Sequence, residues 1–452
     1  MSDLLAARSQ MAMSLAFHII FAVIGIGMPV LMVLAERRWQ RTREPVYLEL
    51  AKRWAKGTAI LFAVGAVSGT VLSFELGLLW PGFMEFAGPI IGMPFSLEGF
   101  AFFMEAIFLG IYLYGWDRIS EKAHLRAGIL VALSGVLSGI FVVIANAWMN
   151  APTGFTMVNG VPTDINPLKA LQTPAAFSQT LHMTLAAFTS TGFGAAGVHA
   201  LMLLRDATNR FHRRGLEIAL TLAIPAALLQ PLSGHHSAQH VAEHQPVKLA
   251  AMEALFETQA GAPLLIGGWP DEATGTVRYG IELPKVLSFM AFNDPTAVVR
   301  GLNEVPEADR PNVLLTHLSF QLMVALGSFM ALVALVALWR MWRRDDLTHH
   351  RWFLRATVAA APMGFIATEA GWMVTELGRQ PWVVHGVLRT ADAVTPMPGL
   401  VVPFLAFTAL YILLAIATAW LLWRQILMAP AEAEWHRVHV PRGRPVVEGV
   451  RG

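Results

Sequence analysis

Two carboxyl side chains interrupt an otherwise apolar stretch of the sequence. The stretch reads PFSLEGFAFFMEAIFLGIYLYGWDR, from Pro94 to Arg118, and the two acids are Glu98 and Glu105. Their spacing of seven residues is two helical turns, so both lie on one face of a helix. Because an ionisable side chain inside a membrane span costs roughly 3 kcal/mol or more, a functional role is the default hypothesis. Carboxyl groups of this kind are suited to accepting and releasing protons.

Other apolar runs also carry isolated polar or sulfur-containing residues. Haem iron is held by His, or by a His and Met pair where the haem transfers electrons, and such cofactors bind in the core of helix bundles. The residues that could supply iron ligands are His18, His182, Met323 and Glu369. Further ionisable residues within apolar runs include Glu75, His199, His317 and Glu376.

Each candidate ligand also has a purely structural interpretation. A single His18 or His182 can hydrogen-bond a backbone carbonyl, and a buried Glu369 can be a protonated, hydrogen-bonded carboxyl. The chain contains 21 Met residues, and most Met side chains fill gaps in a core. The residue types therefore favour a cofactor site or a proton pathway, and they do not choose between the two.

The composition predicts the elements that must position these residues. The 452 residues are 55% hydrophobic and only 14% charged, whereas soluble domains carry about 25% charge. The strand alternation of a membrane barrel is absent, so the chain is predicted to be an all-α integral membrane protein. The sequence has no Cys, which excludes disulfides and thiolate-held metal or iron–sulfur centres. A net charge of +2 gives no indication of nucleic-acid binding.

Apolar runs of spanning length predict about nine transmembrane helices. The first is too long for a signal peptide and is interpreted as a span. The connections on one side hold 24 of the 33 Lys and Arg residues, so the positive-inside rule places the N-terminus outside and the C-terminus in the cytoplasm. The runs are 11–35, 55–80, 95–115, 127–149, 174–204, 216–233, 312–338, 354–376 and 399–423.

This topology places the candidate ligands at similar depth. At 1.5 Å per residue, His18 and Glu369 lie about 10 Å from the outer ends of their spans, and Met323 lies about 16 Å from its own. His182 lies near the outer end of the fifth run. Four separate helices are thus predicted to bring a candidate ligand into the outer half of the bilayer.

The chain divides into four predicted segments. Residues 1–233 contain helices one to six, 234–310 form a long outer loop, 311–429 contain helices seven to nine, and 430–452 form a cytoplasmic tail. Long connections in compact proteins are usually functional or disordered. No internal repeat is evident, so an inverted-repeat transporter receives no support from self-similarity.

The motifs resemble those of subunit I of the cytochrome bd quinol oxidases, and the resemblance extends over essentially all nine predicted helices. The most specific stretch is EAGWMVTELGRQPW, in which GRQPW follows an acid within a span. The other matching stretches are SQMAMSLAFHIIF, SLEGFAFFMEAIFLGIYLYGWDR, VVIANAWMNAP, SQTLHMT and VKLAAMEALFET.

The resemblance implies three haems and a ligand for each. His182 and Met323 match the axial pair of a low-spin haem b. His18 and Glu369 match the ligands of two high-spin haems, one of them a haem b and the other a haem d or b. Arg379 is implied to hold the oxidase centre or its propionates, and weaker matches for the haem surroundings are Trp372, Asn146 and Arg8.

The resemblance also implies routes for protons and quinol. Glu98 matches an acid beside the oxygen-reducing haem, and Glu105 matches an acid on its proton path. Each electron that enters a low-dielectric site needs a compensating proton, and two acids on one helix face can carry protons toward such a site. Lys248 and Glu253 match a quinol-interacting pair in the outer loop, which the family calls the Q-loop.

The sequence departs from the family pattern at three places. Gln321 stands two residues before Met323, where the best-known branch has an Arg. The Q-loop is short, and the acids of the third run are seven residues apart rather than eight. These features resemble the short-loop branch often called cyanide-insensitive oxidases.

The implied activity is that of a respiratory quinol:oxygen oxidoreductase in the bacterial cytoplasmic (inner) membrane. It oxidises ubiquinol or menaquinol at the outer face, reduces O2 to water, and is electrogenic without a proton pump. Its implied partners are a homologous membrane subunit II and a small single-helix subunit. The alternative is a haem-free proton-coupled transporter in which Glu98, Glu105 and Glu369 carry protons.

Two weaker signals concern histidines outside the apolar runs. His236, His240 and His244 are four residues apart, which on a helix would give one metal-binding face, but short His-rich tracts are weak evidence and a solvated loop is favoured. The histidines of the basic connections are interpreted as solvated surface: His124, His349 and His350.

Overall fold

Nine helices of 27 residues or more dominate residues 1–427, the part of the chain that the computed structural model describes. Eight of them are long and apolar enough to cross a membrane. The ninth is α11, whose Thr, Gly and Glu residues lower its hydropathy. The nine are α1 (Asp3–Thr42), α2 (Pro45–Leu79), α3 (Pro81–Tyr114), α4 (Glu121–Asn150), α6 (Ala176–Arg205), α7 (Arg210–His244), α10 (Val313–Trp342), α11 (Arg351–Leu377) and α13 (Val401–Leu427).

Side-chain caps and prolines fix where these helices begin. The side chains of Ser2, Ser120 and Asn312 accept hydrogen bonds from the first-turn amides of α1, α4 and α10. Helices α2 and α3 begin with Pro45 and Pro81, which have no amide hydrogen to satisfy. These starts reduce the number of unpaired donors at helix ends.

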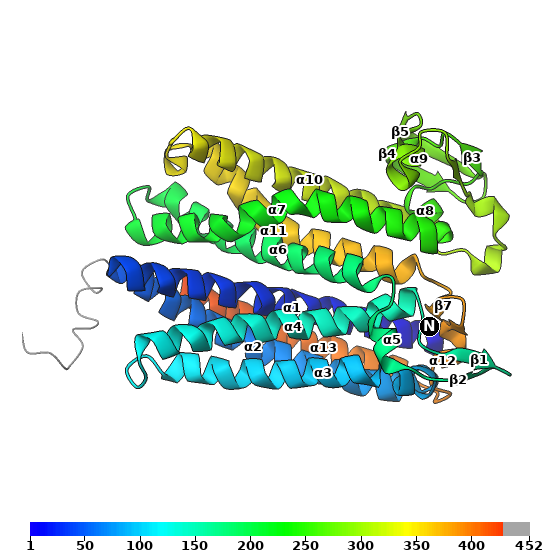
Figure 1. The fold of residues 1–452 in the computed structure, drawn as a ribbon, viewed down its shortest axis with the longest axis horizontal. Coiled ribbons are helices and arrows are strands. Elements are labelled where there is room, and N and C mark those ends of the chain that lie inside the picture. The colour runs from blue at the N-terminus through cyan, green and yellow to red at the C-terminus, as the bar shows by residue number, and fades with distance from the viewer. Residues whose placement is uncertain (428–452) are drawn as a thin grey trace, which may run out of the picture.

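The long helices form two groups that lie side by side (Figure 1). Helices α6, α7, α10 and α11 pack together in one group, and α1, α2, α3, α4 and α13 pack together in the other. Helices α1 and α4 both pack against α6, which joins the two groups. The candidate ligands are therefore divided between two groups that share an interface.

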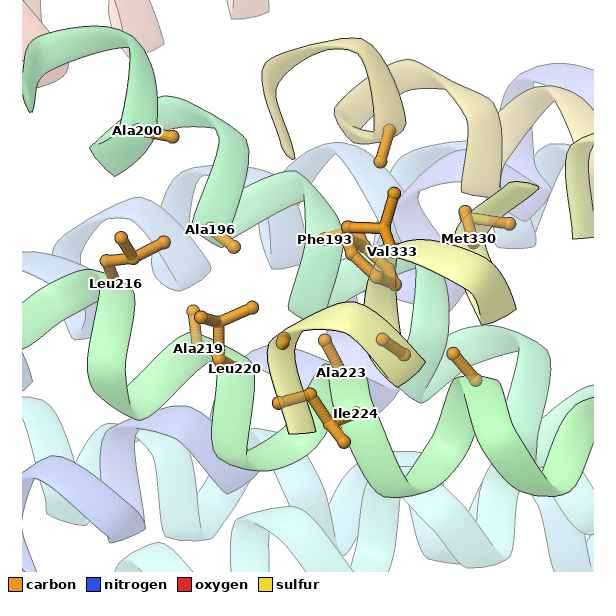
Figure 2. Close-up of a cluster of buried hydrophobic side chains, with 14 of the residues drawn as sticks. Phe193, Ala196, Ala200, Leu216, Ala219, Leu220, Ala223, Ile224, Met330 and Val333 are labelled. Atoms are coloured by element: carbon orange, nitrogen blue, oxygen red, sulfur yellow. The ribbon is translucent and has the colours of Figure 1, made fainter. Parts of the chain in front are cut away.

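Small residues allow close packing in the first group. Figure 2 shows Ala196, Leu220 and Val333 in the buried cluster that α6, α7 and α10 share. A Cβ atom at Gly192 of α6 would come within 2.8 Å of the backbone of Ala223 on α7. No side chain larger than hydrogen could occupy that position without moving a helix, so the two backbones stay in contact.

Helix α7 is longer than the run 216–233 from which it was expected. It spans Arg210–His244, and Pro225 and Pro231 lie within it. The apolar run ends at residue 233, but the His-rich segment that follows continues the helix, because loss of hydropathy does not by itself end helical hydrogen bonding. The expected boundary between residues 233 and 234 thus lies inside α7, and the solvated-loop interpretation of His236 to His244 is wrong.

The Q-loop, residues 234–310, begins within the end of α7 and continues as a segment with its own folded core. A buried cluster that includes Leu249, Leu255, Leu265 and Leu302 forms its core. Its elements are α8 (Pro246–Met252), β3 (Gln259–Ala260), the hairpin β4 (Leu264–Asp271) and β5 (Thr276–Leu283), α9 (Val286–Phe292), β6 (Val298–Val299, antiparallel to β3), and the 3-10 turns Leu302–Glu304 and Glu307–Asp309.

The remaining small elements lie at the same end of the molecule as the Q-loop and the N-terminus (Figure 1). They are the hairpin β1 (Thr156–Val158) and β2 (Val161–Thr163), α5 (Pro167–Leu171), the hairpin β7 (Trp382–Val384) and β8 (Leu388–Arg389), and α12 (Thr390–Ala393). A third 3-10 turn, Leu347–His349, connects α10 to α11. The expected tail 430–452 lies outside the described residues.

His124 is not at the surface, contrary to the sequence-based interpretation. It is only 1% exposed, and its Nδ1 lies 2.9 Å from the carboxylate Oε1 of Glu36, which is fully buried. Its Nε2 lies 2.8 Å from the backbone oxygen of Tyr112. The basic residues around His124 suggested a solvated connection, but Tyr112 of α3 and Trp116, just after that helix, pack against this histidine.

Candidate functional site

His18 lies at the contact between α1 and α2. Its Nδ1 is 2.9 Å from the hydroxyl oxygen of Ser68 on α2. The neighbouring Gly69 leaves space for the ring, since a Cβ atom there would come within 3.0 Å of the His18 Cε1. The imidazole is thus held through one nitrogen while Nε2 has no hydrogen bond to the described residues.

His182 lies at the contact between α6 and α7. Its Nδ1 is 2.9 Å from the hydroxyl oxygen of Ser233 on α7. Its Nε2 is 3.1 Å from the side-chain nitrogen of Gln230, one turn earlier on the same helix. The same Gln230 nitrogen lies 3.3 Å from Nδ1, so this contact alone does not assign the ring nitrogens. Ser233 donates its single hydrogen to Gln230 O and therefore accepts from Nδ1–H, which leaves the lone pair on Nε2. That is the form of imidazole that binds iron.

Met323 lies at the contact between α10 and α11. A Cβ atom at Gly371 of α11 would come within 3.0 Å of the Met323 sulfur. The structure therefore places His182 and Met323 in the same helix group, on α6 and α10 respectively.

Glu369 and Trp372 lie on α11, close to the interface between the two groups. Trp372 packs against a cluster formed by Ile19 and Val23 of α1 and Ala187 of α6. The Oε1 of Glu369 and the Nε1 of Trp372 are buried without hydrogen-bond partners. Unpaired buried polar atoms are rare, and they often mark a site where another group binds.

The end of α11 carries a second carboxyl group with different surroundings. Glu376 accepts a hydrogen bond of 2.5 Å from the side-chain nitrogen of Asn146 on α4, and its other oxygen pairs with Arg379. Arg379 is only 2% exposed, yet its Nε and Nη1 have no partners. A buried guanidinium with unused donors fits an anionic group such as a haem propionate.

The acids of the third predicted span face α4, as their shared helix face requires. The hydroxyl of Ser138 donates to Glu98 over 3.4 Å. Glu105 is 5% exposed, and a Cβ atom at Gly135 would lie 3.2 Å from its carboxylate. Neither acid pairs with a basic side chain in the described residues, so ion pairing does not account for their place within the helix bundle.

Lys248 and Glu253 lie in and just after α8, and both are 5% exposed. Lys248 donates to Asn150 Oδ1 at 2.6 Å. Burial, with Arg379 nearby, lowers the pKa of Lys248 to about 7, whereas burial raises the pKa of Glu253 to about 8. The two residues do not form an ion pair with each other, so each is available to a separate group on a ligand.

Gln321, which replaces an Arg of the best-known branch, connects α10 to the Q-loop. Its Oε1 accepts from the Gly267 amide and its Nε2 donates to Leu265 O, both at 2.9 Å. One turn earlier, His317 bonds the backbone oxygens of Met252 and Gly267 at 2.8 and 3.0 Å. Both side chains of α10 therefore anchor the Q-loop, and Gln321 does not supply the positive charge that an Arg would place two residues before Met323.

The His-rich end of α7 does not form a metal site. The rings of His240 and His244 stack with centroids 4.1 Å apart. Within residues 1–427, no group of three or more His, Cys, Asp or Glu side chains is arranged to hold a metal ion. The weak metal-binding hypothesis for this tract is therefore not supported.

Sequence reasoning missed the hydroxyl and amide partners of the candidate residues. These partners are Ser68, Ser233, Gln230 and Asn150. Serines and amides are common in helices, and no spacing along a single helix shows which of them faces a histidine on another helix. The Ser-Gly pairs at 68–69 and 233–234 were the available signal.

Comparisons with known proteins agree with this arrangement. The family model of cytochrome bd terminal oxidase subunit I matches residues 6–430. The putative cytochrome bd menaquinol oxidase subunit I of Bacillus subtilis (strain 168) is 39% identical over 93% of this chain and 96% of its own length. The cytochrome bd ubiquinol oxidase subunit 1 of the same organism is 34% identical over the full length of both chains.

A solved structure has the same fold. The structure of bd oxidase from Geobacillus thermodenitrificans matches with a TM-score of 0.90 and 39% identity, covering 95% of this chain and 99% of that one. Residues 6–430, which the family model matches, contain every candidate ligand and both candidate quinol residues. The comparisons give no support to the alternative of a haem-free transporter. This chain is a multi-pass membrane protein of the bacterial inner membrane and an oxidoreductase subunit, and it belongs to the cytochrome bd terminal oxidase subunit I family.

Proposed function

We propose that this chain is the catalytic subunit of a respiratory enzyme that oxidises quinol at the outer face of the membrane and reduces O2 to water. The observation that carries the proposal is the pair of histidines, His18 and His182, each held through Nδ1 by a serine. The Nε2 of His18 has no hydrogen bond to the described residues, and the Nε2 of His182 contacts the amide nitrogen of Gln230, so each Nε2 carries the lone pair that would bind iron. This chain belongs to an oxidase family and holds two imidazoles in this way on separate helices. Haem binding explains that arrangement better than a separate structural role for each histidine.

The chain would hold three haems through residues of both helix groups. His182 and Met323 would bind a low-spin haem b, and His18 would bind one of two high-spin haems. Glu369 would bind the other, since its unpaired oxygen faces a buried site. The haems, two b and a third that is d or b, supply one-electron transfer and oxygen reduction. The unused donors of Arg379 support a role in holding a propionate.

Lys248 and Glu253 would bind and deprotonate the quinol. A quinol has two hydroxyl groups, and its oxidation releases two protons. Lys248 can hydrogen-bond a ring oxygen, and Glu253 can accept a proton when it is ionised. Two separate partners suit a head group with oxygens at opposite ends of a ring.

Glu98 and Glu105 would carry protons from the cytoplasmic side toward the oxygen-reducing site. They are two turns apart on α3, and Glu105 is buried without a basic partner. With the N-terminus outside, quinol protons are released outside and the protons for water are taken up inside. Turnover is then electrogenic without a pump.

The proposal includes partner subunits. The family model describes a subunit I, and the proposed complex contains a homologous membrane subunit II and a small single-helix subunit. Relatives of this chain are named for menaquinol and for ubiquinol, and either quinol is compatible with the proposal.

Replacing His182 should remove the low-spin haem. H182A, purified with its partner subunit, is expected to lose the low-spin b band from the reduced-minus-oxidised spectrum and one haem from the pyridine haemochrome count. H236A is the matched control, because His236 lies on the exposed end of α7. A full haem complement in H182A would refute the ligand assignment, and a wild-type complex without haem would refute the proposed function.

The two carboxyl groups of α11 provide a direct test of the second high-spin ligand. E369Q is expected to lose or shift one high-spin haem signal, because an amide is a far weaker ligand for ferric iron than a carboxylate. E376Q should retain that signal, since Glu376 is occupied by Asn146 and Arg379. The opposite outcome, with the loss in E376Q, would move the ligand assignment to Glu376. Magnetic circular dichroism of each variant provides the measurement.

Replacing Glu105 should slow oxygen reduction without removing haem. E105Q preserves shape but cannot transfer a proton as a carboxylate does, so O2 consumption is expected to fall by roughly 10²-fold or more. The spectrum should remain that of the wild type. E85Q changes an exposed acid on the same helix and should retain full activity. Wild-type O2 consumption in E105Q would exclude this acid from the proton path.

The protonation of Glu253 predicts how quinol oxidation depends on pH. Because its pKa is raised to about 8, the carboxylate that accepts a proton becomes the predominant form only above about pH 8, and the rate of quinol oxidation should rise as pH increases through that value. E253Q should be slow and lack this rise. E257Q, a change at an exposed acid four residues later, should keep it. An unchanged pH profile in E253Q would show that another group accepts the proton.

A further inference from the structure

Ser-Gly pairs occur four times in the sequence, always within a long helix. Each pair lies against one of the candidate functional residues. Two pairs on α4 face the acids of α3, through Gly135 beside Glu105 and through Ser138 beside Glu98. The other two, Ser68-Gly69 on α2 and Ser233-Gly234 on α7, face His18 and His182.

The two pairs that face histidines have matching geometry. In each, the serine oxygen lies 2.9 Å from the histidine Nδ1. In each, the following glycine faces the Cε1 edge of the ring, where an added Cβ atom would lie 3.0 Å from His18 and 3.4 Å from His182. The contact between α1 and α2 and the contact between α6 and α7 thus have the same local arrangement, although they involve different helices.

The direction of each serine–histidine hydrogen bond follows from the other bond that the serine makes. Ser68 donates its hydroxyl hydrogen to a backbone oxygen of its own helix, with Val64 O at 3.0 Å and Gly65 O at 3.1 Å. Ser233 donates to Gln230 O at 2.9 Å. A hydroxyl has one hydrogen, so the serine oxygen accepts from the histidine Nδ1–H in both cases.

We propose that Ser68 and Ser233 are positioning residues that fix His18 and His182 as Nδ1–H tautomers and so set how strongly each imidazole donates electrons to iron. The inference rests on the proposed function, because it assumes that these histidines bind haem. An acceptor on the second ring nitrogen orients a metal-bound imidazole and raises its basicity. A more basic ligand stabilises ferric over ferrous iron, so each serine lowers the midpoint potential of the haem that its histidine holds.

The glycine of each pair contributes space. At Gly69 an added Cβ atom would lie 3.0 Å from the His18 Cε1 and would crowd the ring, whereas at Gly234 it would make an ordinary van der Waals contact with His182 at 3.4 Å. Both residues lie on adjacent parts of the helix surface, one contacting the ring nitrogen and the other contacting the ring edge.

Ser233 can be tested through the potential of the low-spin haem. In the assembled complex, S233A is expected to keep that haem and raise its midpoint potential, measured by spectroelectrochemical titration at the low-spin band. S233T keeps the hydroxyl and should restore the wild-type potential. S237A is the matched control, since Ser237 lies one turn further along α7 and bonds Ser178, and it should leave the potential unchanged.

Ser68 can be tested through the iron–histidine bond itself. A five-coordinate ferrous haem with a His ligand shows an iron–nitrogen stretching band in its resonance Raman spectrum, and the frequency rises with hydrogen bonding at Nδ1. S68A should lower this frequency, and S68T should restore it. S73A, which changes a serine on the exposed side of α2 that bonds only Gly69 O, should leave it unchanged.

The outcomes separate this inference from the proposed function. An unchanged potential in S233A, or an unchanged frequency in S68A, would overturn the inference for that serine. If the alanine variant loses its haem, the threonine variant decides: retention of haem with wild-type properties supports the inference, and loss of haem overturns it. The proposed function fails if the wild-type complex contains no haem, a result that does not depend on either serine.

Discussion

The low dielectric of the helix bundle is the constraint on which the rest of the structure depends. No water is available to satisfy a polar group at membrane depth, so each one needs a protein partner or a bound group. Glu75 of α2 accepts hydrogen bonds from Gln10 and Ser14 of α1, both at 2.9 Å, through one carboxylate oxygen. Other buried polar atoms have no partner within the described residues, among them atoms of Glu369, Trp372 and Arg379. These three residues lie on α11 or immediately after it, so the end of this helix offers several unpaired polar atoms to a bound group.

The same constraint explains how the two helix groups work together. Each group is held by its own apolar contacts, with α6, α7 and α10 packed so closely that Gly192 is required at one crossing. The candidate ligands lie where the packing is less complete, at contacts between neighbouring helices. His18 belongs to one group, and His182, Met323 and Glu369 belong to the other. The cluster of α1, α6 and α11 around Trp372 connects them, so a set of cofactors at this interface would lie within the reach of both groups.

The sequence predicted the helices and the functional residue types better than it predicted their surroundings. Hydropathy located all nine long helices, because burial in lipid requires continuous apolar runs. It placed the end of α7 eleven residues early, at 233 instead of His244, because helical hydrogen bonding continues where hydropathy falls. The interpretation of His124 as a surface residue was wrong for a related reason. The charged residues near His124 in the sequence do not show that Glu36, 88 residues away in the chain, packs against this histidine. The partners Ser68 and Ser233 could not be predicted individually, because their role depends on contacts between helices.

The departure at Gln321 shows how one substitution can change the role of a helix face. An Arg at this position would place a positive charge two residues before Met323. Gln321 instead uses both ends of its amide to bind the backbone of β4, and His317 binds the same hairpin and the end of α8. Both residues lie on the first turns of α10, within two turns of Met323 on the same helix. The short Q-loop is therefore anchored by the helix that carries a candidate haem ligand, and the segment that contains Lys248 and Glu253 is held in a fixed position relative to that ligand. In a chain without the long Q-loop insertion, this anchoring would give the proposed quinol site the rigidity that a binding site requires.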